Sequence, residues 1–342
     1  MGMCTGRLLA SSVPYTEADV VVKSPEVELG EGVVWDARCA RLLWVDIMNA
    51  KLFRYDPATG ENEVRDLSWK SDFLSSVVPF SAEADPTGDL VAVTLREGFF
   101  SYNFTTNRLV PLCQNPDVAD GERFNHGMTD PQGNFWAGTL VRDTNNDILP
   151  TAATLYRLSA EGYLDTMLEG VSCSNGICWS DDSKTVYYND TPTGTVQAFD
   201  YDPDTGKMEK PGRPCIVNFD FKTNGMPDGS AIDKDGMLWV AQYNGGRAGR
   251  YNPATGELLA EVYVPQTCGL QVTSVGFGGK NCGDLYLTTA HEFIPVGELE
   301  NLGTPLAGSL CVVSAEKLAF LGAVGGVPVT PIGIKPSGCA TQ

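Results

Sequence analysis

The 342-residue chain has no apolar run of the roughly 18 residues needed to cross a bilayer as a helix. Near the N-terminus only Leu8, Leu9 and Ala10 form an apolar patch, which is too short for the hydrophobic region of a secretory signal. The sequence therefore predicts no membrane partner and a cytoplasmic location.

Basic residues and histidines are also scarce. There are 24 Lys and Arg against 43 Asp and Glu, so the net charge is −19, which disfavours binding to nucleic acid or anionic membranes. The only histidines are His126 and His291, and the ten cysteines are scattered without a Cys-x-x-Cys pair. A Cys/His zinc site thus has no support. With 42% hydrophobic residues, the composition is that of a globular protein.

Helical periodicity is nearly absent, and short runs rich in Val, Tyr, Trp, Phe and Thr alternate with Gly, Asp, Pro and Asn turns. A turn followed by a hydrophobic strand recurs along the chain. Successive copies are separated by 49, 45, 51, 52 and 47 residues, with anchors at Asp36, Asp85, Asp130, Asp181, Asp233 and, more weakly, Lys280. A repeat of about 50 residues with four short strands is typical of a β-propeller blade.

The chain is therefore predicted to be all-β, a single six-bladed β-propeller domain over residues 1–342 with four antiparallel strands per blade. Residues 1–18 are expected to form a tail, 19–23 the closing strand of the last blade, 26–320 the six blades, and 321–342 a C-terminal strand and tail. A β-sandwich or two separate β domains is the alternative, which the regular spacing disfavours.

Four of the six repeats carry a carboxylate or carboxamide five or six residues before the anchor, at Glu31, Asn125, Asn175 and Asp228. In a propeller these positions lie on the innermost strands, so ring symmetry brings the side chains together near the axis. Their oxygens suit a hard divalent cation, with Ca²⁺ expected and Mg²⁺, Mn²⁺ or, through the carboxylates, Zn²⁺ as alternatives. The competing interpretation is that they are ordinary turn residues, since Asn-Gly and Asp-Gly are common turn dipeptides.

The ends of the second strands are expected to return to the same face and to form the rim of a pocket. Arg123 should point into this pocket and bind a substrate oxygen. The predicted rim residues are Asp46, Arg96, Asp143, Asn189, Asp190, Tyr243, Asn244, His291 and Glu292.

The sequence resembles the senescence marker protein/regucalcin/gluconolactonase family of six-bladed propellers. The motifs that carry the resemblance are Gly30-Glu31-Gly32-Val33-Val34-Trp35, the stretch from Arg123 to Thr139, Ser174-Asn175-Gly176 and Pro227-Asp228-Gly229. The resemblance implies one divalent cation held by Glu31, Asn175 and Asp228. It also implies substrate contacts from Arg123, Asn125 and an acidic residue for which Asp143 is the nearest candidate.

Members of this family typically open sugar lactones, and relatives hydrolyse phosphotriesters or other small esters. The resulting hypothesis is a metal-dependent hydrolase of an aldonolactone, with Asp228 as general base and His126 relaying a proton. His126 stands where the family usually has Asp, which leaves the choice of substrate open. The alternatives are an organophosphate or aryl-ester hydrolase on the same ion, and a non-catalytic calcium-binding protein. A small-molecule partner and a monomer or weak homo-oligomer are expected.

Overall fold

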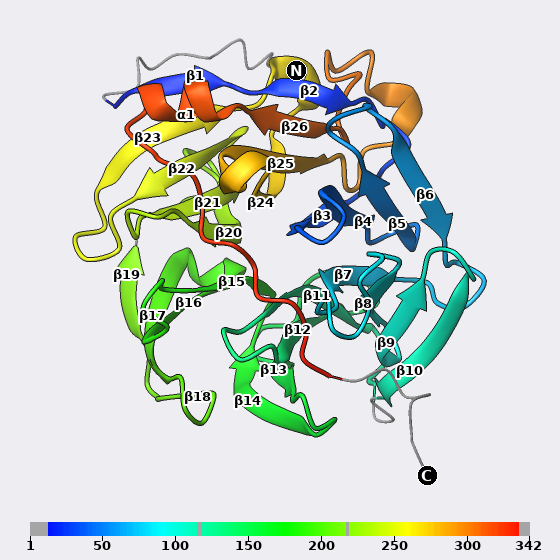
Figure 1. The fold of residues 1–342 in the computed structure, drawn as a ribbon. Helices are drawn as coiled ribbons and strands as arrows, with labels where there is room; N and C mark the ends of the chain where they lie inside the picture. Colours follow the sequence, from blue (N-terminus) through cyan, green and yellow to red (C-terminus); the bar gives the residue numbers. More distant parts are fainter. Residues whose placement is uncertain (1–12, 115–117, 217–218, 335–342) are drawn as a thin grey trace.

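The computed structural model describes residues 13–114, 118–216 and 219–334. Its strands form six sheets arranged as blades around a central axis, as Figure 1 shows. In each blade, consecutive strands pair antiparallel from the axis outward. The predicted six-bladed propeller is confirmed.

The first three blades each contain four strands. Blade 1 comprises β3 (Gly30–Asp36), β4 (Arg41–Asp46), β5 (Lys51–Tyr55) and β6 (Asn62–Asp66). Blade 2 comprises β7 (Leu74–Pro79), β8 (Leu90–Leu95), β9 (Gly98–Asn103) and β10 (Arg108–Gln114). Blade 3 comprises β11 (Glu122–Thr129), β12 (Phe135–Val141), β13 (Ala153–Leu158) and β14 (Leu164–Val171).

The last three blades vary at their outer edges. Blade 4 comprises β15 (Ser174–Trp179), β16 (Thr185–Asp190) and β17 (Thr195–Asp202), with both β18 (Lys207–Met208) and β19 (Arg213–Ile216) paired to β17. Blade 5 comprises β20 (Met226–Ile232), β21 (Leu238–Tyr243), β22 (Arg247–Tyr251) and β23 (Leu258–Tyr263). Blade 6 comprises β24 (Gln271–Gly278), β25 (Asp284–Ala290) and β26 (Leu310–Val313). Short 3-10 turns lie at Thr191–Thr193, Gln266–Cys268, Lys280–Cys282 and Val296–Glu298.

The N-terminal segment closes the ring. Strand β2 (Asp19–Val22) pairs antiparallel with β26 as the outer strand of blade 6, where a strand over 19–23 is predicted. The segment predicted as a tail holds one more strand. Strand β1 (Tyr15–Glu17) runs parallel to β23 and becomes a fifth strand of blade 5. Residues 1–12 of the predicted tail lie outside the described residues.

The C-terminal segment differs from the predicted strand. Helix α1 (Ala315–Phe320) follows β26, and the described residues beyond it form only isolated bridges at Gly326 and Ile332. Figure 1 shows this segment crossing the face of the ring. Its backbone bonds to the far ends of inner strands, with Val327 N donating to Ile232 O and Ile332 N to Pro79 O. Residues 335–342 lie outside the described part of the chain.

This C-terminal segment covers an apolar cavity of about 330 Å³ at the end of the channel where the inner strands finish. Its walls include Trp35, Trp179, Phe277 and the segment from Val327 to Thr330. None of the predicted site residues lines it. The cavity and the polar residues at the starts of the inner strands therefore occupy opposite ends of the channel.

Apolar contacts between neighbouring blades form the core, and the anchor aspartates add buried hydrogen bonds. Trp44, Trp136 and Trp239 are completely buried, as expected for packing residues. Asp130 accepts hydrogen bonds from the indole of Trp136 (2.8 Å) and the hydroxyl of Tyr201 (2.9 Å) in the next blade. Asp130 thus bonds once within its own blade and once to the neighbouring blade.

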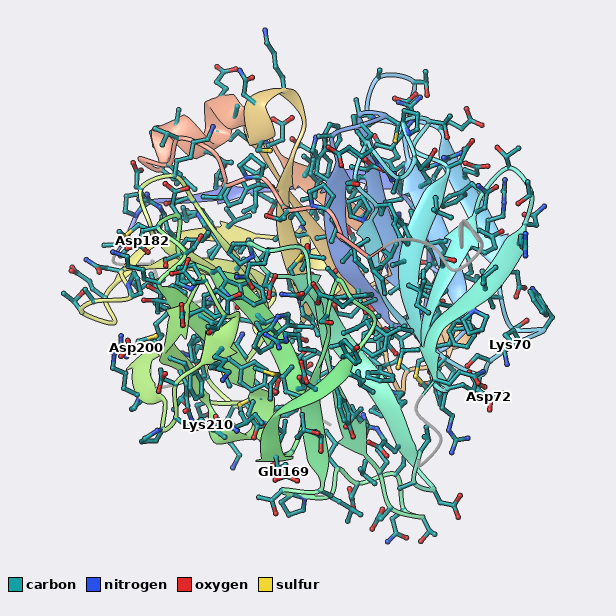
Figure 2. All side chains as sticks on the ribbon, turned by 60° about the horizontal axis from the view of Figure 1, so that its bottom comes forward. Lys70, Asp72, Glu169, Asp182, Asp200 and Lys210 are labelled. Carbon is teal, nitrogen blue, oxygen red and sulfur yellow. The ribbon has the colours of Figure 1, made fainter. Side chains whose placement is uncertain are left out.

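The surplus of negative charge is mainly on the outside. Figure 2 shows acidic side chains such as Glu169, Asp182 and Asp200 projecting from the perimeter of the ring. Among the described residues, no helix combines the length and apolar character required to cross a membrane.

Candidate functional site

The inner strands share one irregularity at the end of the channel where they begin. In each blade, the pairing of the first and second strands shifts register within a few residues of the strand start. The shift leaves Ser75, Asn125, Asn175, Asp228 and Thr273 unpaired in their blades, and in blade 1 it begins directly after Glu31. A bulge re-aims side chains away from the regular alternation of a strand. Six equivalent bulges thus place two carboxyls, two carboxamides and two hydroxyls around one axis.

Hydrogen bonds connect the polar residues of blades 3, 4 and 5. Arg123 Nη1 donates to Asn125 Oδ1 at 2.6 Å, and Asn125 Nδ2 donates to Asn175 Oδ1 at 3.0 Å. Asn175 Nδ2 in turn donates to Thr191 Oγ1 at 2.7 Å, which donates to Pro227 O at 2.8 Å. Each amide nitrogen is therefore used within the protein. The Asn175 carbonyl oxygen keeps a lone pair for a ligand.

Glu31, Asp228 and His126 form a buried titratable group beside this chain. The two carboxyl groups interact with one another, and burial raises the pKa of Glu31 to about 8 although the Gly32 amide donates to it. Burial and the neighbouring Glu31 raise the pKa of Asp228 well above its usual value. His126 Nδ1 lies 3.2 Å from Glu31 Oε2, and burial lowers the imidazole pKa to about 4. His126 is thus a neutral hydrogen-bonding partner at neutral pH.

The residues present fit a hard divalent cation. Asp228 Oδ1 is buried without a hydrogen-bond partner, and two adjacent carboxyl groups lack a compensating positive charge between them. A cation held by Glu31, Asn175 and Asp228 would provide both the missing partner and the charge. Within the described ranges, no group of three or more His, Cys, Asp and Glu side chains is arranged to hold a metal ion. The predicted donor set is of another kind, because one of its three members is a carboxamide.

A thiol also lies in this neighbourhood. The Asn125 and Asn175 side-chain amides contact Cys173 Sγ at 3.9 and 3.8 Å. Burial raises the pKa of Cys173 to about 12, so the group remains a protonated thiol at neutral pH. A thiolate is the nucleophilic form of cysteine, and this residue is accordingly part of the packing rather than a nucleophile.

The rim contains a network that the sequence predicted only in part. Glu292, which follows β25, accepts a hydrogen bond from Tyr243 OH at 3.2 Å and pairs with Arg142 Nη2 at 3.1 Å. Gln271, the first residue of β24, donates from Nε2 to the backbone oxygen of Glu292 at 3.3 Å. Tyr243 and Glu292 were predicted on the rim, whereas Arg142 and Gln271 were not. The sequence feature that could have indicated them is their position, since Arg142 directly follows β12 and Gln271 begins β24.

Other predicted residues have local roles instead. The Asp143 carboxylate accepts from the backbone amides of Asn145 (2.8 Å) and Asp147 (2.9 Å), so it stabilises its own turn. Asp46 accepts from the backbone amides of Glu28 and Leu29. Both ring nitrogens of His291 contact backbone oxygens, those of Ile294 and Pro25. The structure therefore brings Arg123 and Asn125 to the axis but engages Asp143 in its loop.

Comparisons with known proteins identify relatives over most of the chain. The family described as the SMP-30/Gluconolactonase/LRE-like region matches residues 29–291. A relative in Bacillus subtilis, named sugar lactone lactonase YvrE, is 36% identical over 288 residues, which cover 84% of this chain and 91% of the relative. Regucalcin of Danio rerio is 34% identical over 275 residues, or 80% of this chain and 87% of that protein.

The fold has close counterparts among solved structures. A crystal structure of regucalcin from Agrobacterium tumefaciens, described as a calcium-binding protein, superposes with a TM-score of 0.80 at 25% identity. The superposition covers 95% of this chain and 99% of that one.

Proposed function

The chain belongs to the SMP-30/gluconolactonase/LRE-like family, and from this premise we propose that it is a divalent-cation-dependent hydrolase that opens a sugar lactone. The observation that carries the proposal is the meeting of Glu31, Asn175 and Asp228 beside Arg123 and Asn125 at one end of the channel. Acidic oxygens for a cation and polar donors for a substrate thereby occur at the same place.

Glu31, Asn175 and Asp228 would hold the cation, for which Ca²⁺ is our first choice because all three donors are oxygen atoms. Such an ion, when bound, polarises a carbonyl oxygen and lowers the pKa of bound water. The Asn125 amide donates to Asn175 Oδ1 and so holds the Asn175 side chain in a fixed orientation. The Gly32 amide does the same for Glu31, through a hydrogen bond of 2.6 Å to Oε2.

Asp228 is the proposed general base. Its Oδ1 atom has no partner in the protein. A bound cation would favour the ionised carboxylate, which could then accept a proton from the attacking water. His126 lies against Glu31, and its Nε2 atom is also without a partner. Because the ring is neutral, one nitrogen can accept a proton while the other donates its own. His126 could in this way relay the proton released by the attacking water to the leaving oxygen of the opened ring.

Arg123 and Asn125 are the proposed binding residues. The Arg123 guanidinium is buried, and its bonds to Asn125 Oδ1 and Phe124 O hold it in one orientation. A positioned guanidinium donates to substrate oxygens and fixes the ring against the reacting groups.

The test is lactone hydrolysis followed with a pH indicator, with and without a chelator. Activity should disappear with the cation and return when it is restored, and Asp228→Ala should lower kcat by at least about a hundredfold. Asp200→Ala, a change to an exposed aspartate in β17, is the matched control and should keep the full rate. Full activity after complete removal of metal, or in Asp228→Ala, would contradict the proposal.

A second candidate is a non-catalytic calcium-binding protein. It is favoured by the relatives named regucalcin and by the description of the Agrobacterium tumefaciens structure as a calcium-binding protein. Calorimetric titration with Ca²⁺ on the same preparation separates the two. Tight binding without turnover of any lactone would favour the second candidate.

A further inference from the structure

Two walls of different hydrogen-bonding character meet at the mouth of the channel. Blade 3 supplies the Arg123 guanidinium, which can only donate hydrogen bonds, whereas Arg142 after the same blade's second strand is already paired with Glu292 across the mouth. Blade 6 supplies the Glu292 carboxylate and the Gln271 amide. Figure 1 shows β11 and β12 on the side of the ring opposite β24 and β25. A molecule bound between these walls therefore meets donors on one side and acceptors on the other.

Gln271 has an unused acceptor. The residue is 8% exposed, and Nε2 donates to the Glu292 backbone, yet Oε1 is buried without a partner. An unsatisfied buried carbonyl oxygen is costly and is rare unless a ligand or water completes it. Because an amide oxygen only accepts, the missing partner must carry a donor hydrogen.

Glu292 is held firmly in place beside Gln271. Its carboxylate is bonded by Arg142 and Tyr243, and burial together with Glu292 raises the pKa of Tyr243, which keeps the phenol as a donor. The next residue, Phe293, has a φ of +67°, which is strained for a bulky side chain. The Phe293 ring lies 5.2 Å from Arg142 Cζ. The Glu292 carboxylate is therefore held in one arrangement by its two partners.

We infer that Gln271 and Glu292 form a hydroxyl-recognition subsite that restricts the substrate to a polyhydroxylated ring. The inference rests on the proposed hydrolase function and adds two residues that select the substrate. Ring hydroxyls donate to Gln271 Oε1 and to the remaining lone pairs of Glu292, while Arg123 donates to oxygens on the opposite side. Tyr243 and Arg142 act as positioning residues, because they hold the Glu292 carboxylate.

The same chemistry disfavours the alternative esters. A phosphotriester or simple aryl ester has no hydroxyl donor, so the two acceptors would face ester oxygens and remain unpaired. A site built to bond a substrate hydroxyl rejects an analogue that lacks it far more strongly than an apolar pocket rejects a missing methylene. The acceptor wall thus selects against apolar esters as well as in favour of sugars.

The experiment compares two lactones of the same ring size, glucono-1,5-lactone and unsubstituted δ-valerolactone, on the cation-loaded full chain. Gln271→Met removes the amide at nearly constant volume, and Glu292→Gln is a second variant that keeps the shape. Gln266→Met, at an exposed position in the turn before the same strand, is the matched control. The measured quantity is the ratio of kcat/KM for the hydroxylated lactone to kcat/KM for the unsubstituted one.

We expect this ratio to fall at least about tenfold in both site variants, mainly through a higher KM for glucono-1,5-lactone, and to stay at the wild-type value in Gln266→Met. An equal loss on both lactones indicates a merely structural role and overturns the inference, as does an unchanged ratio. Wild-type protein that opens neither lactone refutes the proposed function itself. Wild-type protein that opens only δ-valerolactone, or prefers it, refutes the subsite alone.

Discussion

Arg142 and Glu292 are 150 residues apart in the chain and come from opposite blades of the ring, yet Arg142 Nη2 lies 3.1 Å from Glu292 Oε1. Arg142 follows the second strand of blade 3, and Glu292 follows the second strand of blade 6. Because these blades face each other across the axis, the ion pair bridges the mouth of the channel. It therefore lies over the end of the channel that contains Glu31, Asn175 and Asp228.

This bridge leads to a prediction about stability. Arg142→Gln should lower the free energy of unfolding by about 1–3 kcal/mol, because it leaves the buried Glu292 carboxylate without its cationic partner. The Arg213–Asp200 pair is the control, since its side chains are 58% and 70% exposed and such pairs contribute little. Arg213→Gln should change stability by less than about 0.5 kcal/mol in urea denaturation. Equal effects of the two substitutions would contradict the role of burial.

The anchor aspartates should differ widely in their contribution to stability. Asp130 is fully buried and accepts from the Trp136 indole and the Tyr201 hydroxyl, whereas Asp181 at the equivalent turn of the next blade is exposed. Asp130→Ala leaves two buried donors unpaired, so we expect a loss of about 3–5 kcal/mol. Asp181→Ala should cost less than about 0.5 kcal/mol. Thermal or urea unfolding of both variants measures the difference, and similar losses would refute it.

The buried carboxyl of Glu31 predicts how stability depends on pH in cation-free protein. Its pKa is about 8 in the folded chain against a usual value of 4.5, so the folded state retains a proton that the unfolded state releases. Stability from this group is present below pH 4.5 and is lost as the pH rises through 8. His126, with a pKa lowered to about 4, acts in the opposite direction between pH 4 and 6.5. The Glu31 effect therefore dominates between pH 6.5 and 8.

The melting temperature of chelated protein should accordingly decrease between pH 6.5 and 8. Added Ca²⁺ should raise it more at pH 8 than at pH 6.5, because the cation competes with protons for the same carboxyls. Glu31→Gln is the control and should reduce both the slope and the response to Ca²⁺. A melting temperature that rises with pH in this window would show that Glu31 ionises normally.

Ring closure can be tested by truncation from the N-terminus. Removing residues 1–17 deletes β1, the fifth strand of blade 5, and should change the cooperativity of the unfolding transition only slightly. Removing residues 1–22 also deletes β2, the outer strand of blade 6, and exposes the edge of β26. We expect the second truncation to lower the melting temperature further and to broaden the unfolding transition. Circular dichroism during heating measures both, and identical transitions for the two truncations would contradict the closing role of β2.

The repeat in the sequence was enough to predict the ring, its closing strand and the positions of Glu31, Asn125, Asn175 and Asp228. Such a prediction succeeds because each blade is a local unit whose turn and strand pattern recurs about every 50 residues. Side chains at one phase of the repeat necessarily come to the same radius and height. The register shift in every inner strand then directs them toward the axis.

Only the tertiary structure decided which polar side chains face one another. Asp143 and His291 have the right residue types and positions, but nearby backbone groups engage them first. Arg142 contacts Glu292 across the ring. The repeat in the sequence does not predict this contact, because it describes each blade and not the contacts between opposite blades. The altered pKa values of Glu31 and His126 also depend on complete burial. These side chains become buried, and contacts across the axis form, only when the six blades close into a ring. The fold of each blade, in contrast, is determined by its local sequence.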